Sequence, residues 1–338
     1  MQTAGPEGEP TRIGVIVDRE GLGDALLKLP MLRAIKRARP DGELWWMANH
    51  TTVMADVLRV QTQHLVDKVV TGLDLSESVQ GSLPRLRELP PFDLVFDTRT
   101  RVLGVALARI FLRHREFYAC LPGFLLSTRR PAAMWARPRG IGARAMSMAI
   151  AAFGTTADGS GSLPVSDAAQ AIAAHDLPPG PRYIGLAPGS REARKNWPLG
   201  RYAEVAAALA ADGHVPVFIL GPFERPWLAE LRASVPAALF PEIEPIDRTL
   251  ALIARLALVV ANDSGMGHMT AALGVPLVSL FGPTKAERWR PFGGDVRVVR
   301  AQDFGGKAMD AIPVEAVLAA VRRKLEGMQP AAGGAVVA

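Results

Sequence analysis

The sequence has few cysteine, aromatic and charged residues, and these shortages exclude several classes of protein. Cys120 is the only cysteine among 338 residues, so the chain has no internal disulfide and no cysteine-based metal site. We expect a buried thiol in a reducing cytoplasm. Charged residues make up 21% and hydrophobic residues 49%, which indicates a soluble globular chain.

Long apolar runs and targeting segments are also missing. The run Leu277–Phe281 is far shorter than the ~20 residues that a membrane helix needs. Residues 1–10 are acidic and rich in proline and glycine, unlike a signal or transit peptide. We predict that residues 1–10 and the low-complexity tail 329–338 are disordered. The expected location is cytoplasmic.

Common nucleotide-binding motifs are incomplete or missing. The turn Gly21-Leu22-Gly23-Asp24 begins like a dinucleotide motif, but Leu26 occupies the place of its third glycine. No acid follows the second predicted strand to bind a ribose, which weakens an NAD-dependent oxidoreductase as an alternative. The chain has neither Walker A spacing nor the Asp-x-Asp pair that commonly holds a metal and a nucleotide diphosphate. We therefore expect no metal and no cofactor.

Buried-strand patterns alternate with helical patterns, which predicts parallel, doubly wound sheets. One series starts at Arg12–Val17, and a second starts at Tyr183–Ala187 after the proline-rich stretch 177–182. We predict two Rossmann-like domains facing across a cleft, and we leave open that the last helix packs back on the first domain. We predict domains at 11–170 and 183–328, joined by a linker at 171–182. In the first domain, the further predicted strands are 44–48, 68–70 and 92–96. The predicted helices of that domain are 25–37, 53–60 and 102–112. Residues 128–161 give no clear assignment.

Arginine is concentrated between residues 98 and 144. That segment holds ten arginines, no lysine and one acid, Glu116, in a chain of net charge +6. Such a segment suits an anionic partner such as a phosphorylated glycan or a membrane surface. The alternative, with equal weight, is that these arginines form an ordinary solvated surface of an arginine-rich chain. Few aromatics are interleaved, which argues against a nucleic-acid partner.

The stretch 256–284 predicts a strand, a glycine-rich turn, a short helix at 269–273 and a second strand. The backbone N–H groups of Ser264 to Gly267 precede that helix and form a predicted anion cradle. Asp263 is either the cap of the helix or a contact to a ligand. His268, taken alone, is more typical of a structural histidine than of a catalyst.

Three further positions follow predicted strands. Ser190, with the cations around Lys195, suits a diphosphate, or is ordinary solvated charge. Glu224 either accepts ribose hydroxyls or starts a helix, where acids are favoured. On spacing alone, Asp24 is a helix cap rather than an acceptor of a proton from a hydroxyl group.

Taken together, these residues resemble glycosyltransferase family 9, the heptosyltransferases of the lipopolysaccharide inner core. Three elements carry the resemblance. They are G-x-G-D-x-x-x-x-x-P from Gly21 to Pro30, P-G-x-x-x-x-x-K-x-W-P from Pro188 to Pro198, and D-S-G-x-x-H-x-x-A-A-L-G-x-P from Asp263 to Pro276. The third element is followed by Leu280-Phe281-Gly282-Pro283-Thr284.

The resemblance implies a GT-B fold and inverting, metal-independent transfer from a nucleotide sugar. The expected donor is ADP-heptose, bound by the C-terminal domain. By match to the family, Asp24 becomes the general base, and Lys195 offsets charge on the leaving diphosphate. The residues expected to bind the donor are Ser190, Glu224, Asp263, Ser264, Gly265, Met266, Gly267 and His268.

The acceptor implied by the resemblance is an anionic lipopolysaccharide core on lipid A, at the cytoplasmic face of the inner membrane. The N-terminal domain would bind it through Arg99 and Arg101, which follow the fourth strand, and through Arg129 and Arg130. Another nucleotide sugar or acceptor within the family is the main alternative. A sugar-nucleotide epimerase and a non-catalytic binding protein are further alternatives.

Overall fold

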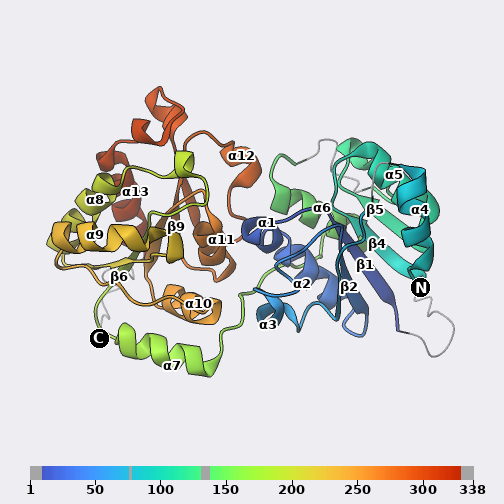
Figure 1. The fold of residues 1–338 in the computed structure, drawn as a ribbon, viewed down its shortest axis with the longest axis horizontal. Helices are drawn as coiled ribbons and strands as arrows, with labels where there is room; N and C mark the ends of the chain where they lie inside the picture. Colours follow the sequence, from blue (N-terminus) through green and yellow to red (C-terminus); the bar gives the residue numbers. More distant parts are fainter. Residues whose placement is uncertain (1–9, 76–77, 131–137, 329–338) are drawn as a thin grey trace, which may run out of the picture. The chain divides into compact units, whose positions relative to one another are not determined.

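The computed structural model describes residues 10–75, 78–130 and 138–328. The chain divides into two compact units, Met1–Leu163 and Pro164–Ala338. Each unit holds one five-stranded sheet with helices packed against it (Figure 1). Two doubly wound α/β units confirm the predicted fold class. Apart from Pro10, the terminal segments predicted to be disordered lie outside the described residues.

The first sheet is parallel throughout and has the order β3-β2-β1-β4-β5. Its strands are β1 (Arg12–Val17), β2 (Glu43–Ala48), β3 (Lys68–Val70), β4 (Phe92–Asp97) and β5 (His114–Ala119). Strands β1, β2 and β4 are almost wholly buried. This burial accounts for their continuous apolar sequences.

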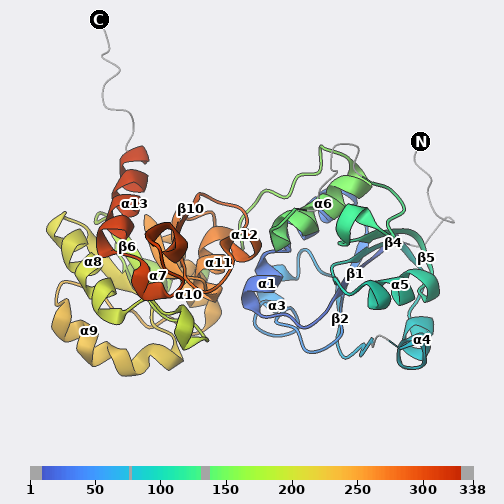
Figure 2. The same ribbon diagram turned by 90° about the horizontal axis from the view of Figure 1, so that it is seen from above.

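Helices cover both faces of the first sheet (Figure 2). They are α1 (Leu22–Leu26), α2 (Leu29–Ala38), α3 (Arg59–Thr62), α4 (Val79–Glu88), α5 (Val102–Phe111) and α6 (Ile141–Phe153), with a 3₁₀ turn at Pro122–Phe124. Ile16, Val95 and Phe117 point to one face and share a core with α4 and α5. Phe96 points to the other face, where its ring lies 6.1 Å from that of Phe153 in α6.

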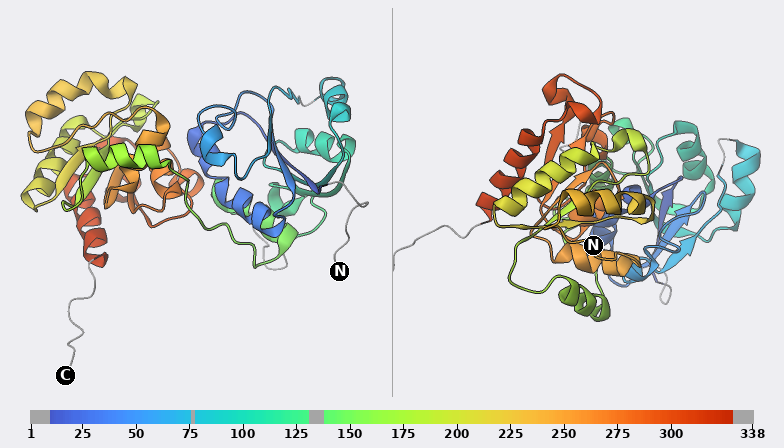
Figure 3. Two further views of the ribbon diagram at one scale, coloured as in Figure 1. Left: turned by 90° about the horizontal axis from the view of Figure 1, so that it is seen from below. Right: turned by 60° about the vertical axis from the view of Figure 1, so that its left-hand side comes forward.

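The second sheet is also parallel and has the order β10-β9-β8-β6-β7. Its strands are β6 (Tyr183–Ala187), β7 (Val215–Phe218), β8 (Leu258–Asn262), β9 (Leu277–Phe281) and β10 (Val296–Arg300). Val260 and Val278 point towards a core that includes residues of α8 (Leu199–Ala211) and α13 (Val314–Gly327). These two helices lie side by side (Figure 3). Helix α13 thus packs on the sheet of its own unit.

The opposite face of this sheet is covered by α11 (Gly265–Ala272), where Gly267 lies against Ala261 and Leu277. Helix α10 (Ile246–Ala254) contacts α11 and also packs on α7 (Asp167–Asp176). The remaining elements are α9 (Leu228–Ser234), α12 (Ala286–Trp289) and 3₁₀ turns at Ala193–Lys195, Pro222–Trp227, Ala301–Phe304 and Met309–Ala311. None of the helices in the described ranges is long and apolar enough to cross a bilayer.

Several element boundaries differ from those predicted. The segment 171–182 does not form a simple linker, because its first half belongs to α7, which packs on α10 in the second unit. The helix predicted at 53–60 is wrong, since the chain forms turns there and α3 begins only at Arg59. The prediction overlooked α4 and β5, and the unassigned region contains α6.

In both sheets the order in which strands are added reverses at the first strand. Strand β1 lies between β2 and β4, and β6 lies between β7 and β8. At such a reversal the loops after the two central strands diverge and leave a crevice at the carboxyl edge. In the first unit, Asp24 lies in the segment that follows β1, and Arg99 lies in the one that follows β4. In the second unit, Lys195 follows β6 and Asp263 follows β8.

Candidate functional site

Asp24 lies in a short helix that a proline terminates. Pro30 is the second residue of α2 and cannot donate a backbone hydrogen bond to the preceding turn, so α1 ends at Leu26 and α2 starts at Leu29. The helix predicted at 25–37 is thus divided in two. Lys28 occupies the junction, one turn after Asp24.

The spacing-based prediction that Asp24 caps the helix is wrong. Helix α1 begins at Leu22, its N-cap is Gly21, and no side chain caps it. Asp24 is the third residue of the helix, and its Oδ2 lies 2.8 Å from Nζ of Lys28. The carboxylate is therefore part of an ion pair, at the point where the chain leaves the carboxyl edge of the sheet.

Lys28 is buried among oxygen atoms. Its Nζ donates to the carbonyl oxygen of Asp24 at 3.0 Å and to Oε2 of Glu20 at 3.2 Å. Burial lowers the pKa of Lys28, but the carboxylates of Asp24 and Glu20 outweigh burial, so its pKa lies above the ordinary lysine value. Lys28 is therefore a permanent cation beside Asp24.

Arg99 also forms a buried ion pair. Its Nε and Nη2 donate to Oδ1 and Oδ2 of Asp97 at 2.9 and 2.7 Å, and Nη2 also donates to the carbonyl of Gly104 at 2.9 Å. Burial lowers the pKa of Arg99, but the Asp97 carboxylate outweighs burial and raises it. These contacts tie the end of β4 to the start of α5. The guanidinium thus has a structural role that the sequence did not reveal.

A cavity of about 350 Å³ lies at the carboxyl edge of the first sheet. Its walls come from residues that follow β1, β2, β3 and β4, namely Asp18, Arg19, Asn49, His50, Asp74, Leu75, Arg99, Arg101 and Gly104. Arg101 is exposed in this wall, whereas Arg99 is buried. Mixed charge of this kind suits a polar ligand with anionic groups.

Arg129 lies at the opposite edge of the same sheet. After β5 the chain turns back along that strand, and Nη2 of Arg129 donates to Oε1 of Glu116 at 2.6 Å. Arg129 lines a second cavity with residues at the beginnings of strands, including Arg12 and Asp93. The structure therefore does not bring Arg129 together with Arg99 and Arg101, which line the other cavity. Arg130 follows it and is exposed.

In the second unit, three loops converge on Asp263. Nζ of Lys195 lies 3.2 Å from its Oδ2, and the hydroxyl of Thr284 donates to the same oxygen at 2.7 Å. Lys195 also lies 2.9 Å from Oε1 of Glu192. Lys195 follows β6, Asp263 follows β8, and Thr284 follows β9, so the fold joins positions that are distant in sequence.

Asn262 fixes the β6 loop against the β8 loop. Its side-chain amide donates to the carbonyl of Pro188 at 2.6 Å, and its Oδ1 accepts from the hydroxyl of Tyr202 at 3.0 Å. The backbone N–H of Trp197 donates to the same oxygen at 3.3 Å. Asn262 is fully buried, so the loops that carry Ser190 and Asp263 hold a defined geometry.

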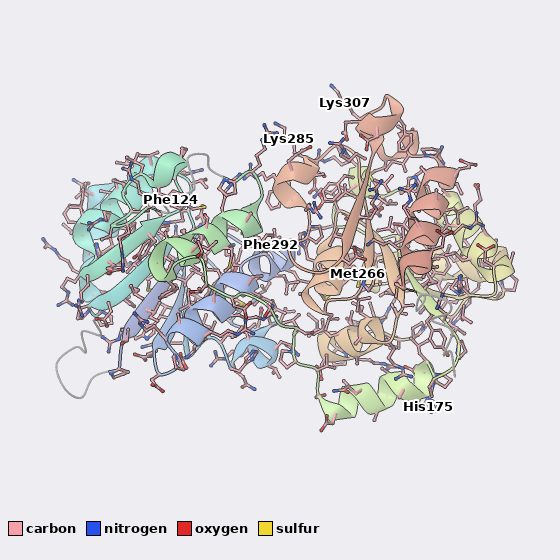
Figure 4. The ribbon with its side chains drawn as sticks, turned by 180° about the vertical axis from the view of Figure 1, so that it is seen from behind. Phe124, His175, Met266, Lys285, Phe292 and Lys307 are labelled. Carbon is pink, nitrogen blue, oxygen red and sulfur yellow. The ribbon has the colours of Figure 1, made fainter. Side chains whose placement is uncertain are left out.

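The predicted anion cradle is the first turn of α11. The helix starts at Gly265 rather than at 269, with Ser264 as its N-cap (Met266 is labelled in Figure 4). Within the described ranges, the Oγ of Ser264 is buried without a hydrogen-bond partner. Helix amides and an unused hydroxyl at one end suit an anion. His268 is buried in this helix.

Glu224 lies against two glycine turns. A Cβ atom at Gly189 would lie 2.2 Å from Oε1 of Glu224, and one at Gly221 would lie 2.7 Å from Oε2. The carboxylate therefore occupies the space between the turns after β6 and β7, near Ser190. Next to it, the ring of Phe223 is 85% exposed.

Sequence reasoning overlooked Glu20, Lys28, Asn262 and Thr284. Lys28 was detectable, since an acid and a base four residues apart meet on one helix face. The other three depend on contacts between different strands, for which the sequence has no local signal. No group of three or more metal-binding side chains (His, Cys, Asp or Glu) occurs in the part of the chain that the structure describes.

Comparisons with known proteins give a family model and several relatives. The family model "Glycosyltransferase family 9 (heptosyltransferase)" matches residues 125–311, more than half of the chain. The chain is 33% identical over 128 residues to lipopolysaccharide heptosyltransferase 2 of Escherichia coli K12, an alignment that covers 35% of this chain and 36% of that protein. It is 34% identical over 111 residues to lipopolysaccharide heptosyltransferase 1 of Pseudomonas aeruginosa, covering 32% and 31%. The chain thus spans about a third of the length of these curated relatives.

Solved structures share the fold over nearly the whole chain. A family 9 glycosyltransferase from Veillonella parvula superposes with a TM-score of 0.70 at 19% identity, covering 96% of this chain and 100% of that one. The E. coli ADP-heptose lps heptosyltransferase II gives 0.65 at 21% identity, covering 95% and 100%. At these identities the likeness establishes the GT-B fold.

Proposed function

The chain belongs to glycosyltransferase family 9, and from that premise we propose an inverting, metal-independent transfer of a sugar from a nucleotide-sugar donor to an acceptor hydroxyl. The observation that carries the proposal is the convergence of Lys195, Asp263 and the first turn of α11 at one switch point. A fixed cation beside free helix amides is suited to a diphosphate.

In the second unit, the donor diphosphate lies against Ser190 and the α11 turn from Ser264 to Gly267. Glu224 accepts the ribose hydroxyls, while Asp263 and His268 hold the loop or the sugar. Lys195 offsets the negative charge that develops on the diphosphate as the glycosidic bond breaks. This arrangement needs no metal, because a side-chain cation supplies the charge.

In the first unit, Asp24 takes the proton from the acceptor hydroxyl. The oxygen attacks the anomeric carbon, and the electron pair of the bond to the diphosphate leaves with the diphosphate. Because attack and departure occur on opposite faces, the configuration inverts. The cavity with Arg101 in its wall binds the anionic part of the acceptor.

The names of the relatives indicate the chemistry of the donor and the acceptor. Similar proteins are named lipopolysaccharide heptosyltransferases, and one solved structure is described as an ADP-heptose enzyme. We infer that the donor is ADP-heptose and that the acceptor is an anionic lipopolysaccharide core on lipid A. Relatives numbered 1, 2 and 3 match at 34%, 33% and 28% identity, so each of these positions in the core is a candidate for the acceptor.

A lipid-anchored acceptor requires that the enzyme bind at a membrane surface. We propose that α5 contacts the cytoplasmic face of the inner membrane. Val102, Leu103 and Ile110 are 53%, 52% and 68% exposed. At ~100° per residue they fall within one arc of about 100°. The helix starts beside the cavity, at Arg101. Exposed apolar side chains among arginines are typical of helices that lie on anionic lipid.

Other functions compatible with the fold are a family 9 transferase with a different nucleotide sugar or acceptor, a sugar-nucleotide epimerase and a non-catalytic binding protein. An epimerase from Methanocaldococcus jannaschii shares the fold at a TM-score of 0.52. An epimerase forms its product without an acceptor, and a binding protein forms none.

The test is an assay of ADP release from ADP-heptose, with and without a core acceptor, for the wild type and Asp24→Asn. We expect acceptor-dependent release by the wild type. The variant should keep donor affinity and lose at least ~100-fold in kcat, as expected for removal of a general base. Acceptor-independent product would indicate the epimerase, and full turnover by Asp24→Asn would remove this residue from the chemistry.

A further inference from the structure

The ammonium group of Lys28 is buried, and the neighbouring carboxylates of Glu20 and Asp24 compensate its charge. Its side chain is 4% exposed, and its ammonium group contacts Asp24 Oδ2 at 2.8 Å, Glu20 Oε2 at 3.2 Å and the Asp24 carbonyl at 3.0 Å. The backbone N–H of Lys28 bonds to Ala25, so the break before α2 leaves the Asp24 carbonyl to the side chain. Lys28 thus holds both the carboxylate and the backbone of Asp24.

Glu20 anchors the other side of Lys28. Its side chain is wholly buried, and its Oε1 accepts from Nε1 of Trp46 at 2.9 Å and from the hydroxyl of Thr52. Trp46 lies in the middle of β2 and is fully buried. A chain of contacts therefore runs from the rigid sheet through Glu20 and Lys28 to Asp24.

Of the three side chains Glu20, Lys28 and Asp24, only that of Asp24 is accessible to solvent. The Asp24 side chain is 24% exposed, compared with 4% for Lys28 and 0% for Glu20. A carboxylate on the surface of a five-residue helix has little of its own to hold it in one rotamer. A buried cation that bonds to Oδ2 fixes the rotamer of the carboxylate.

We propose that Lys28, held by Glu20, is a positioning residue that orients the Asp24 carboxylate for proton abstraction. This rests on the proposed role of Asp24 as general base. Lys28 does not touch the substrate and acts through Asp24. A buried ion pair is often no more stabilising than apolar side chains of similar volume, so fold stability alone is a weak reason for this network.

The experiment compares Lys28→Met with Lys36→Met as a matched control. Lys36 lies in α2, and its Nζ bonds to Asp67 at 2.7 Å and to the Gly42 carbonyl at 2.8 Å, before β2 and β3 start. For Lys28→Met we expect kcat to fall ~10- to 100-fold, as misplacement of a catalytic group does, while ADP affinity stays within about twofold. Lys36→Met should change neither quantity.

A double variant separates positioning from a structural role. If Lys28 acts through Asp24, the pair Asp24→Asn and Lys28→Met is no slower than Asp24→Asn alone. Additive losses in kcat, or an unchanged kcat in Lys28→Met, would overturn the proposal. If Lys28→Met does not fold, Glu20→Gln decides: a folded variant with the wild-type kcat overturns the proposal, and a lower kcat at unchanged ADP affinity supports it.

Failure of this inference is distinguishable from failure of the proposed function. Loss of turnover in Asp24→Asn together with normal rates in Lys28→Met refutes only the positioning role. Normal turnover in Asp24→Asn refutes the base itself.

Discussion

Two buried cations in the first unit, Lys28 and Arg99, are each paired with a carboxylate close in sequence. Asp24 is four residues before Lys28, and Asp97 is two residues before Arg99. The two pairs differ in accessibility. Asp97 is wholly buried with its arginine, whereas Asp24 reaches the surface. This contrast separates a structural ion pair from a carboxylate that is available for chemistry.

The arginine pair yields a prediction about stability. Replacing Arg99 with alanine leaves the Asp97 carboxylate buried without its partner, which costs about 3–5 kcal/mol of unfolding free energy. Arg101→Ala should change stability by no more than about 0.5 kcal/mol, since its side chain is exposed. Urea unfolding measures both. Equal stability of the two variants would show that Arg99 is not the structural member.

The Arg101→Ala variant also tests acceptor binding. Arg101→Ala should raise the KM for an anionic acceptor several-fold while kcat changes little. An unchanged acceptor KM in Arg101→Ala would exclude this wall of the cavity from the acceptor site.

At the scale of elements, local breaks in regular structure position the chemistry. Pro30 divides the first helix, and this places Lys28 at a junction where its side chain reaches Asp24 and Glu20. In the second unit, α11 starts directly at Gly265, so its first-turn amides lie beside Asp263 and Lys195. Each site is therefore the start of a helix at a switch point, as expected for doubly wound sheets.

Helix α5 provides the prediction at this scale. Leu103→Ser combined with Ile110→Ser should reduce co-sedimentation with phosphatidylglycerol-containing vesicles several-fold, because each change removes exposed apolar surface. Ile172→Ser, on α7 of the second unit, is the control, since Ile172 is also exposed. Binding should weaken as salt increases. Equal binding by the double variant and the control would argue against α5 as the membrane contact.

For the whole molecule, each sheet places its polar loops at the carboxyl edge, and the two units have different tasks in the proposed function. The loops of the second unit combine a cation, helix amides and a carboxylate near glycine turns. Those of the first unit combine an accessible carboxylate with a polar cavity. A donor diphosphate suits the former, and an acceptor hydroxyl suits the latter.

Ligand-linked stability tests this division on the intact chain. At a concentration of 100 times its Kd, ADP should stabilise the protein by about 2.7 kcal/mol, seen as a higher Tm. The shift should be the same with and without EDTA if no metal takes part. NAD at the same concentration should give no shift. Loss of the ADP effect in EDTA would contradict metal independence.

Parts of the fold were predictable because buried strands have a local signature. The runs at Arg12–Val17, Lys68–Val70 and Tyr183–Ala187 form strands with the expected bounds. Strand β5 was overlooked because it begins His-Arg-Glu at a sheet edge, where polar side chains remain partly exposed. Helix α7 was overlooked because it is short and lies next to the proline-rich stretch taken as a linker.

The sequence by itself determined the alternation of buried strands and helices that defines the fold class, the glycine turns at strand ends and the family motifs, since each depends on neighbouring residues. Only the tertiary structure decided which charges pair. It joined Lys195 to Asp263 and Thr284, and it placed Arg129 at the far edge of its sheet. Ion pairs and hydrogen bonds depend on separations of about 3 Å between loops that are distant in the chain, and such separations are set by strand order and register.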